Sequence, residues 1–247
     1  QVYDLVEGNI GSEVRARIAA IPQRVDQPLA QAVAKTICLL QYVQSVPRTA
    51  ENIAACLHAS IDADSCLAPV REALVRLQDE GLAHAVPQSG TFVSRIDLHM
   101  AAAALYIRET VERRVTSELC DKATEEDITR LRAILRETDD AVANQDFVAF
   151  YKADNGFHEL TYAIAGHPEV FKWISDVTTP LDRFRYLRTI TEELPWKRTQ
   201  NEHRVIVNAI AAHDASKVVD SVMDHLDPML NDREKIVSRF PQYFENA

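Results

Sequence analysis

Asp154 and His158 have the types and the spacing of a metal-binding pair. They are four residues apart in the segment 146–165, whose apolar spacing predicts a helix. Residues four apart project from the same helix face about 6 Å from each other, so this carboxylate and this imidazole can chelate a divalent ion together. The alternative is that His158 is an ordinary half-buried polar residue of an amphipathic helix.

Two later histidines could complete such a site. His203 and His225 lie on separate predicted helices, and the helices of a bundle core can bring their side chains to one point. Asp154 and the three histidines together form a mixed oxygen and nitrogen donor set, which suits zinc best and also accommodates nickel, manganese or iron. Such a set leaves coordination positions open for water or for a small ligand.

The open positions could accept the carboxylate of a small organic acid. A guanidinium group can pair with a carboxylate through two parallel hydrogen bonds. Arg108 is our first candidate for this contact with an effector, and Arg185 and Arg188 are the others.

The segments that must position these side chains are almost all helical. Gly, the costliest ordinary residue in a helix interior, occurs only 6 times in 247 residues, whereas average usage would give roughly 17. Short connections between periodic segments predict a mainly α fold with an all-helical bundle domain over residues 98–240. About six helices are expected there, over 98–120, 124–144, 146–165, 168–189, 197–213 and 215–238.

Residues 1–95 show a different pattern. An apolar stripe of helical spacing runs from Leu29 to Val43, and further helices are predicted to begin near Ala50 and at Pro69. Gly81 ends the last of these helices, and two short strands around a Gly-containing turn follow it. A helix-turn-helix followed by a small β-hairpin is the winged-helix pattern.

The composition excludes several classes of function. With 27 basic and 37 acidic residues, the net charge of −10 does not favour binding to nucleic acid or to a membrane through bulk charge. Neither of the Gly-rich motifs that bind nucleotides occurs. The four cysteines have irregular spacings, which is typical of free thiols in a reducing compartment. No apolar run approaches the ~20 residues that cross a bilayer, so we expect a cytoplasmic protein.

Several stretches resemble one family when taken in order. The run APVREALVRLQDEGL, residues 68–82, resembles the recognition helix of GntR-type transcriptional regulators. Residues 87–94, PQSGTFVS, resemble the tip of the wing in the same family. Residues 108–112, RETVE, resemble the start of the helical effector-binding domain in the FadR-like branch.

That branch also has an Asp-x-x-x-His pair, a Glu-His pair and a late His-Leu pair. This sequence has Asp154 with His158, then Glu202 with His203, and finally His225 followed by leucine, in the same order. The match covers about residues 68–230. The resemblance implies a ligand-responsive DNA-binding regulator of transcription rather than an enzyme. It further implies a homodimer on a palindromic operator, a divalent metal ion held by Asp154 and the three histidines, and a small organic acid as effector.

The winged-helix prediction also indicates which residues could contact DNA. Arg71 and Arg76 on the recognition helix, with Arg48 at the start of the preceding helix, could reach phosphates or a guanine edge. Gly90 and Thr91 of the wing could approach a phosphate or the minor groove. The alternative is that the arginines are ordinary solvated helix residues, because acidic side chains surround them.

Two other functions stay open at this point. Residues 1–66 diverge from the family, and the segment 60–66 replaces a tight turn whose arginine contacts DNA. This divergence would fit a ligand-binding or interaction module that no longer binds DNA. A metal-dependent hydrolase could use the same Asp/His cluster with Glu202 as general base, although we find no established catalytic signature.

Overall fold

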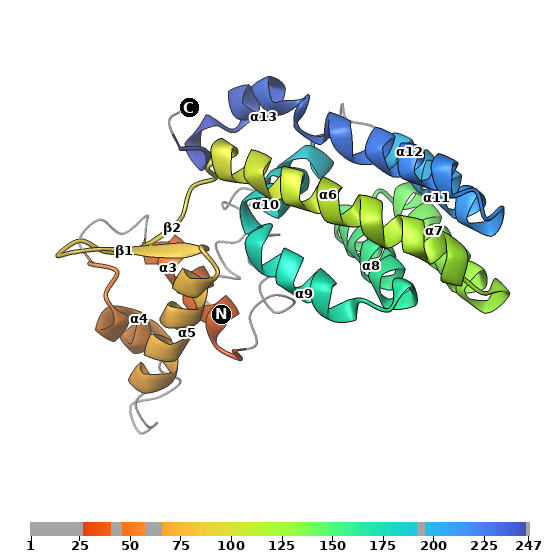
Figure 1. Ribbon diagram of the computed structural model, residues 1–247. Coiled ribbons are helices and arrows are strands. Elements are labelled where there is room, and N and C mark those ends of the chain that lie inside the picture. Colours follow the sequence, from red (N-terminus) through yellow and green to blue (C-terminus); the bar gives the residue numbers. More distant parts are fainter. Residues whose placement is uncertain (1–26, 41–45, 58–65, 192–195, 246–247) are drawn as a thin grey trace. The chain divides into compact units, whose positions relative to one another are not determined.

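The computed structural model describes residues 27–40, 46–57, 66–191 and 196–245 (Figure 1). The chain divides into two compact units, Gln1–Arg95 and Ile96–Ala247. Nearly all of the segment 60–66, in which the sequence departs from the family pattern, lies outside the described residues. Each unit has its own hydrophobic core.

The described residues of the first unit form three helices and a two-stranded sheet. The helices are α3 (Ala30–Leu40), α4 (Ala50–Leu57) and α5 (Leu67–Asp79). Each helix buries one apolar face, and the fully buried residues Ile37, Ile53 and Leu77 come from the three helices in turn. The stripe of i, i+3 and i+4 positions in the sequence therefore faces the core of this unit.

Strands β1 (Ala83–Val86) and β2 (Gly90–Val93) form an antiparallel hairpin directly after α5. Gly81 has a φ of +66°, which lets the chain leave α5 while the amide of Leu82 donates to the carbonyl of Leu77. The turn at the hairpin tip is Pro87–Ser89, and Gly90 is already the first residue of β2. This order of helices and strands agrees with the winged-helix prediction.

Gly90 is required by a close approach of two backbone segments. It has a φ of +114°, and a Cβ atom at this position would lie 2.9 Å from backbone atoms of Arg48. Arg48 pairs with Gly90 in a parallel bridge, and its carbonyl accepts a hydrogen bond from the amide of Thr91. The wing is thereby joined to the segment that precedes α4.

The second unit is a helical bundle. Its α-helices are α6 (Leu98–Lys122), α7 (Glu125–Ala143), α8 (Phe147–Ala165), α9 (Pro168–Val177), α10 (Thr179–Thr189), α11 (Trp196–Ala211), α12 (Ala215–Leu226) and α13 (Arg233–Arg239), with short 3₁₀ turns at Asp227–Leu230 and Pro241–Tyr243. Figure 1 shows α6 running along the bundle, and it packs against α8, α10 and α12. None of the described helices is both long and apolar enough to cross a membrane.

Local signals set the ends of the helix that carries the predicted metal pair. The carboxylate of Asp146 caps the first turn of α8 by accepting hydrogen bonds from the amides of Val148 and Ala149. Gly166 ends the same helix in the left-handed conformation, with a φ of +88°. These two caps start and stop α8 so that Asp154 and His158 lie in its middle.

Two of the expected helices are each divided in the structure. The segment 168–189 breaks at Thr178 between α9 and α10, and the segment 215–238 breaks at the 3₁₀ turn Asp227–Leu230. Pro180 lies just after the first break and Pro228 lies within the second, and a residue without an N–H cannot continue the hydrogen bonds of the preceding helix. The bundle therefore has eight α-helices among the described residues, where about six were expected.

The end of the chain packs against the beginning of the second unit. The amide of Ile96 donates to the carbonyl of Tyr243 at 2.7 Å, and the amide of Glu245 donates to the carbonyl of Ile96 at 3.0 Å. Around this contact lies a small separate core, which is made of Ile96, Phe184, Leu187, Ile236 and Phe244. Two of these residues belong to α10, so this helix links the small core to the interior of the bundle.

Candidate metal centre

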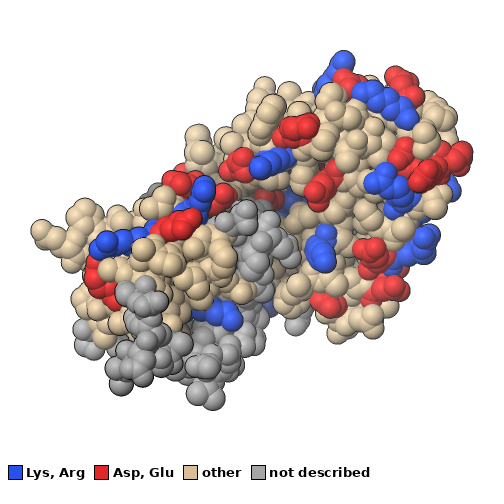
Figure 2. Space-filling model, turned by 90° about the horizontal axis from the view of Figure 1, so that it is seen from below, with Lys and Arg blue, Asp and Glu red and all other residues tan. Residues whose placement is uncertain are grey.

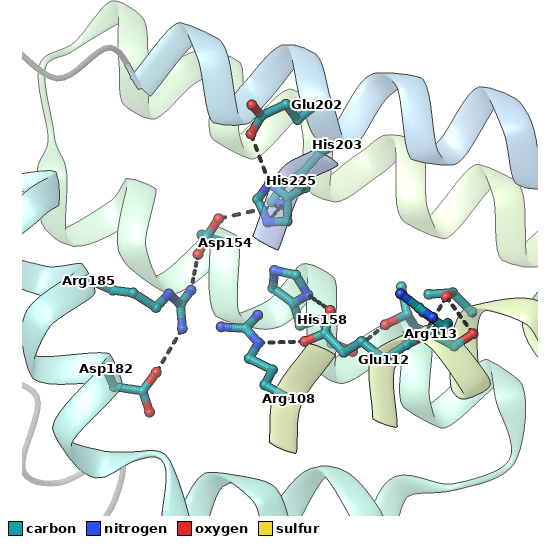
Figure 3. A network of polar contacts seen from close by, with 12 residues as sticks. Arg108, Glu112, Arg113, Asp154, His158, Asp182, Arg185, Glu202, His203 and His225 are labelled. Carbon is teal, nitrogen blue, oxygen red and sulfur yellow. Dashed lines mark hydrogen bonds and ion pairs between the residues drawn. The ribbon is translucent and has the colours of Figure 1, made fainter. Parts of the chain in front are cut away.

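Five helices of the bundle contribute side chains to one buried polar network (Figure 3). Helices α8, α11 and α12 bring Asp154 with His158, His203 and His225 together, and we call these four residues the histidine centre. Helices α6 and α10 supply the charged residues around it. All four side chains of the centre are buried.

The three imidazoles lie close enough to bind one ion. One ring nitrogen from each of His158, His203 and His225 lies within 4.8 Å of the others, and no second such group occurs among the residues that the structure describes. The Nε2 atoms of His203 and His225 are 3.3 Å apart. Bonds of 2.0–2.1 Å from zinc to nitrogen at tetrahedral angles would separate two nitrogens by about 3.3 Å, so this pair fits the ion. Asp154 Oδ1 is 3.6 Å from His203 Nε2.

Several atoms of the centre are buried without a hydrogen-bond partner among the described residues. They include Asp154 Oδ1, His158 Nε2 and His203 Nδ1. Leaving a buried polar atom unpaired costs about 1–3 kcal/mol, so such atoms in a native protein call for a partner. A metal ion bound to Asp154 Oδ1 and His158 Nε2 would satisfy two of the three.

Two carboxylates orient the imidazoles from outside the centre. Glu112 Oε2 lies 3.1 Å from His158 Nδ1, and Glu202 Oε2 lies 2.9 Å from His225 Nδ1. An imidazole that donates its Nδ1 proton to a carboxylate keeps the Nε2 lone pair for a metal, and this arrangement is common behind metal-binding histidines. The ring of Phe157 stacks on His203 with centroids 4.1 Å apart and restricts that side chain as well.

Sequence reasoning missed the positions of both carboxylates. The sequence indicates Glu112 only as part of a family motif, and Glu202 as the partner of His203 in another family motif and as a possible base for a hydrolase. The available signals were short-range: Glu112 follows Arg108 by four residues, and Glu202 directly precedes His203. Neither spacing says which histidine a carboxylate will contact, because that depends on helix packing.

The environment keeps the imidazoles of His158 and His203 neutral. Burial lowers the pKa of His158 to about 4, although the neighbouring Glu112 carboxylate acts in the opposite direction. Burial also holds the pKa of His203 well below its ordinary value. Neutral imidazoles have a lone pair available, so both side chains are ready to bind a cation at pH 7.

Asp154 stays ionised in this buried position. Burial by itself would raise the pKa of Asp154, but the charged guanidinium of Arg185 outweighs burial and holds the pKa below its usual range. Asp154 Oδ2 accepts a hydrogen bond from Arg185, which also donates to Asp182 Oδ1 at 2.8 Å. Arg185 thus fixes one oxygen of Asp154 and leaves Oδ1 facing the histidines.

The three arginines proposed as effector contacts lie in different places. Arg108 is buried beside the centre, and its Nε donates to Glu112 Oε1 at 2.5 Å. Arg185 also lies beside the centre, on α10. Arg188, one turn later on α10, instead pairs with Asp232 at 2.9 Å. The structure therefore brings two of the three arginines into the polar network of Figure 3.

The residues proposed to contact DNA also differ in exposure. Arg71 and Arg76 are exposed on α5, and Arg71 pairs with Glu51 of α4 at 2.8 Å. The guanidinium of Arg48 instead lies over the ring of Phe92, 3.9 Å from its centroid.

Of the two wing residues, Gly90 is half-buried, whereas Thr91 is buried. On the face drawn in Figure 2, basic and acidic side chains are interspersed.

A winged-helix unit followed by a helical bundle defines a class of protein, the winged-helix regulators of transcription. Comparison with known proteins agrees with this class. Residues 103–228 match the FCD domain, the helical domain of one branch of the GntR family. The chain belongs to this family of GntR-type transcriptional regulators.

The similar proteins are regulators of transcription rather than enzymes. The chain is 30% identical over 181 residues to an uncharacterized HTH-type transcriptional regulator in an unstable DNA locus of Streptomyces ambofaciens, a match covering 71% of this chain and 73% of that protein. It is 27% identical over 158 residues to the HTH-type transcriptional repressor RspR of Escherichia coli, covering 64% and 69% of the two chains.

Solved structures show the same fold at low sequence identity. Escherichia coli McbR/YncC aligns with a TM-score of 0.62 and 16% identity over 86% of this chain and 98% of that one. A putative GntR regulator from Rhodococcus sp. RHA1 aligns with a TM-score of 0.60 and 16% identity, covering 83% and 98%. Membership of the family, shown by the domain match and by the sequence relatives, sets aside the hydrolase considered from the sequence: the chain is a transcriptional regulator.

Proposed function

We propose that this regulator responds to a small organic acid through a metal ion held by the histidine centre. Zinc is the ion that the donor set of one carboxylate and three imidazoles suits best, with nickel, manganese or iron as alternatives. The observation that carries the proposal is the pair of buried, unpartnered donor atoms, Asp154 Oδ1 and His158 Nε2, beside the facing Nε2 atoms of His203 and His225. When bound, the ion would supply a Lewis acid that attracts a carboxylate oxygen.

The side chains around the centre support a role for a carboxylate effector. Arg108 is the direct contact that we propose, because Glu112 accepts only from its Nε and no described residue accepts from its two terminal amino groups. Arg185 holds Asp154 in place, and in our proposal it positions this donor atom rather than binding the acid. Arg188 is engaged by Asp232, so we propose that it stabilises α10.

We further propose that the protein binds a palindromic operator as a homodimer. Helix α5 is the second helix of the helix-turn-helix, and its exposed Arg71 and Arg76 are suitably placed to reach phosphates or base edges. Two such helices in a dimer would double the contacts and offset the acidic surroundings. Effector binding can change DNA affinity only if the acid binds one dimer geometry better than another.

The metal proposal is tested by elemental analysis of the purified full-length protein. We expect roughly one zinc or similar ion per chain, as a single four-donor site holds. Replacing His158 or His225 by alanine should remove most of the metal. His167→Ala is the matched control, because His167 pairs with Glu118 outside the histidine centre and should not affect metal content.

Equal metal content in the wild type and in the His158 and His225 variants would contradict the proposal. DNA binding is tested separately by selecting operators from random DNA with the same protein. Enrichment of a two-fold symmetric sequence is expected. Recovery of no sequence would instead favour a module that has lost DNA binding.

A further inference from the structure

The buried charges around the histidine centre limit which ligand can bind there. The network contains two guanidinium groups, from Arg108 and Arg185, and three carboxylates, from Glu112, Asp154 and Asp182 (Figure 3). All five side chains are buried. Because two positive charges face three negative ones, the protein itself contributes one uncompensated negative charge.

The other groups labelled in Figure 3 do not change this balance, and the Arg113 side chain drawn there is exposed. Glu202, at the edge of the centre, pairs with the exposed Arg198 at 2.7 Å, so the two contribute no net charge. A histidine that gives its Nε2 lone pair to a metal is neutral. A divalent ion in the centre would therefore leave one net positive charge in the buried network.

The hydrogen-bond donors of the network also indicate a single anionic group. Arg185 already donates to Asp182 through Nη1 and to Asp154 through Nη2. Arg108 donates to Glu112 only through Nε. The outer edge of its guanidinium, formed by the two terminal amino groups, has no acceptor among the described residues and can therefore bind a ligand.

The outer edge of Arg108 and the metal donors are near each other. Glu112 joins them, with one oxygen 2.5 Å from Arg108 Nε and the other 3.1 Å from His158 Nδ1. One small carboxylate could thus contact both the ion and Arg108. A further buried polar atom nearby, the hydroxyl of Tyr162 one turn after His158, has no described partner and is uncharged.

We propose that the ligand of this site is a small monocarboxylic acid, whose single negative charge is shared by the metal ion and Arg108. The inference rests on the proposed function, because it requires the ion in the histidine centre. Among the described residues of the network, a second carboxylate on the ligand would find neither a compensating charge nor a second guanidinium edge. Burying an uncompensated charge is strongly unfavourable.

The test compares acids of nearly equal size and different charge. Propionate, 2-hydroxypropionate and malonate are titrated calorimetrically into zinc-loaded full-length protein at pH 7.5, and zinc content is measured before and after each titration. We expect both monocarboxylates to bind and malonate to bind at least about tenfold more weakly than the better of them.

A charge-neutralising variant sharpens the comparison. Asp182→Asn removes one of the three carboxylates. It should reduce or reverse the difference in affinity between the monocarboxylates and malonate. Asp139→Asn is the matched control, because Asp139 is half-exposed on α7 and pairs with Arg204 outside this network. The Asp139→Asn protein should show the same difference in affinity between the monocarboxylates and malonate as the wild type. The wild-type preference decides the question even if Asp182→Asn does not fold.

Two outcomes would overturn the monoanion proposal alone: malonate binding as tightly as the monocarboxylates, or neither monocarboxylate binding to protein that holds zinc. A protein that takes up no zinc would overturn the proposed function and this inference together. The zinc measurement distinguishes the two cases.

Discussion

At the scale of single residues, Glu112 connects the proposed metal-binding residue His158 to Arg108, the proposed contact with the ligand. One of its oxygens faces His158 and the other accepts from Arg108, and the side chain is buried. Burial alone would raise the pKa of Glu112, but Arg108 and His158 more than compensate and hold the pKa below its ordinary value. The carboxylate therefore remains charged and orients both neighbours.

Replacing Glu112 by glutamine should weaken zinc binding. The amide carries no charge and polarises His158 less, and the loss of such an outer partner typically reduces metal affinity by about 10–100-fold. Competition with a chelating dye measures the change. Glu118→Gln is the control, because Glu118 pairs with His167 and Lys122 away from the centre. An unchanged affinity in Glu112→Gln would show that the contact to His158 does not support the metal.

At the scale of elements, α5 presents the residues that would meet DNA. Its buried side, with Val70, Leu74 and Leu77, packs on the core of the first unit, so Arg76 projects to solvent on the other side. Arg71 forms an ion pair with Glu51, whereas Arg76 has no ion-pair partner among the described residues. Arg76 is thus the stronger candidate for a contact with DNA.

Arg76→Ala should lower affinity for the selected operator by about tenfold, the loss expected when one good contact to a base edge is removed. Fluorescence anisotropy at fixed salt measures this affinity. Arg130→Ala, an exposed arginine of α7 that pairs with Asp127, should leave it unchanged. If both variants bind like the wild type, Arg76 is a solvated surface residue.

Helix α10 joins two parts of the bundle. Arg185 faces the histidine centre, whereas Phe184 and Leu187 pack in the small core around Ile96. Phe244, from the end of the chain, fills the same core and is only 1% exposed.

Phe244→Ala should destabilise the second unit by about 3 kcal/mol, because truncating a buried phenylalanine loses its transfer energy and leaves a cavity. Urea unfolding followed by circular dichroism measures the change. Tyr106→Ala, at a site that is 72% exposed, should change stability by no more than about 0.5 kcal/mol. A similarly small effect for Phe244→Ala would mean that the chain end adds little to stability.

Short-range patterns in the sequence predicted the helices and strands better than they predicted the breaks between helices. The period of apolar residues predicted α3 to α8, because one buried face imposes that period on the sequence. Two short strands around a Gly-containing turn predicted the hairpin. The breaks at Thr178 and at Asp227–Leu230 were missed, although Pro180 and Pro228 stand beside them. Proline in the first turn of a helix is also common, so its presence alone does not decide between a continued and a divided helix.

At the scale of the whole molecule, the histidine centre should link metal binding to the stability of one unit only. All of its donor atoms belong to residues 96–247, and a ligand that binds only the folded state stabilises it. At free zinc of about 100 times the dissociation constant, this stabilisation is about 2.7 kcal/mol.

Removing the metal with a chelator should therefore lower the unfolding temperature of the helical unit and leave that of the winged-helix unit unchanged. Differential scanning calorimetry of the full chain resolves the two transitions. His203→Ala protein serves as the control and should not respond to the chelator. Equal shifts of both transitions, or none in either, would contradict a metal site confined to the second unit.

The sequence by itself determined what depends on neighbours a few residues apart. The Asp154–His158 pair, the helix over 146–165 that carries it and the turn at Gly81 all follow from the geometry of one helix or one turn, and the family motifs follow from their order along the chain. Only the tertiary structure decided which distant groups meet. It brought His203 to His225 and Glu112 to His158, and it directed Arg185 to Asp154 but Arg188 to Asp232. Such contacts depend on how the helices pack, and packing is set by the whole buried surface rather than by any local spacing.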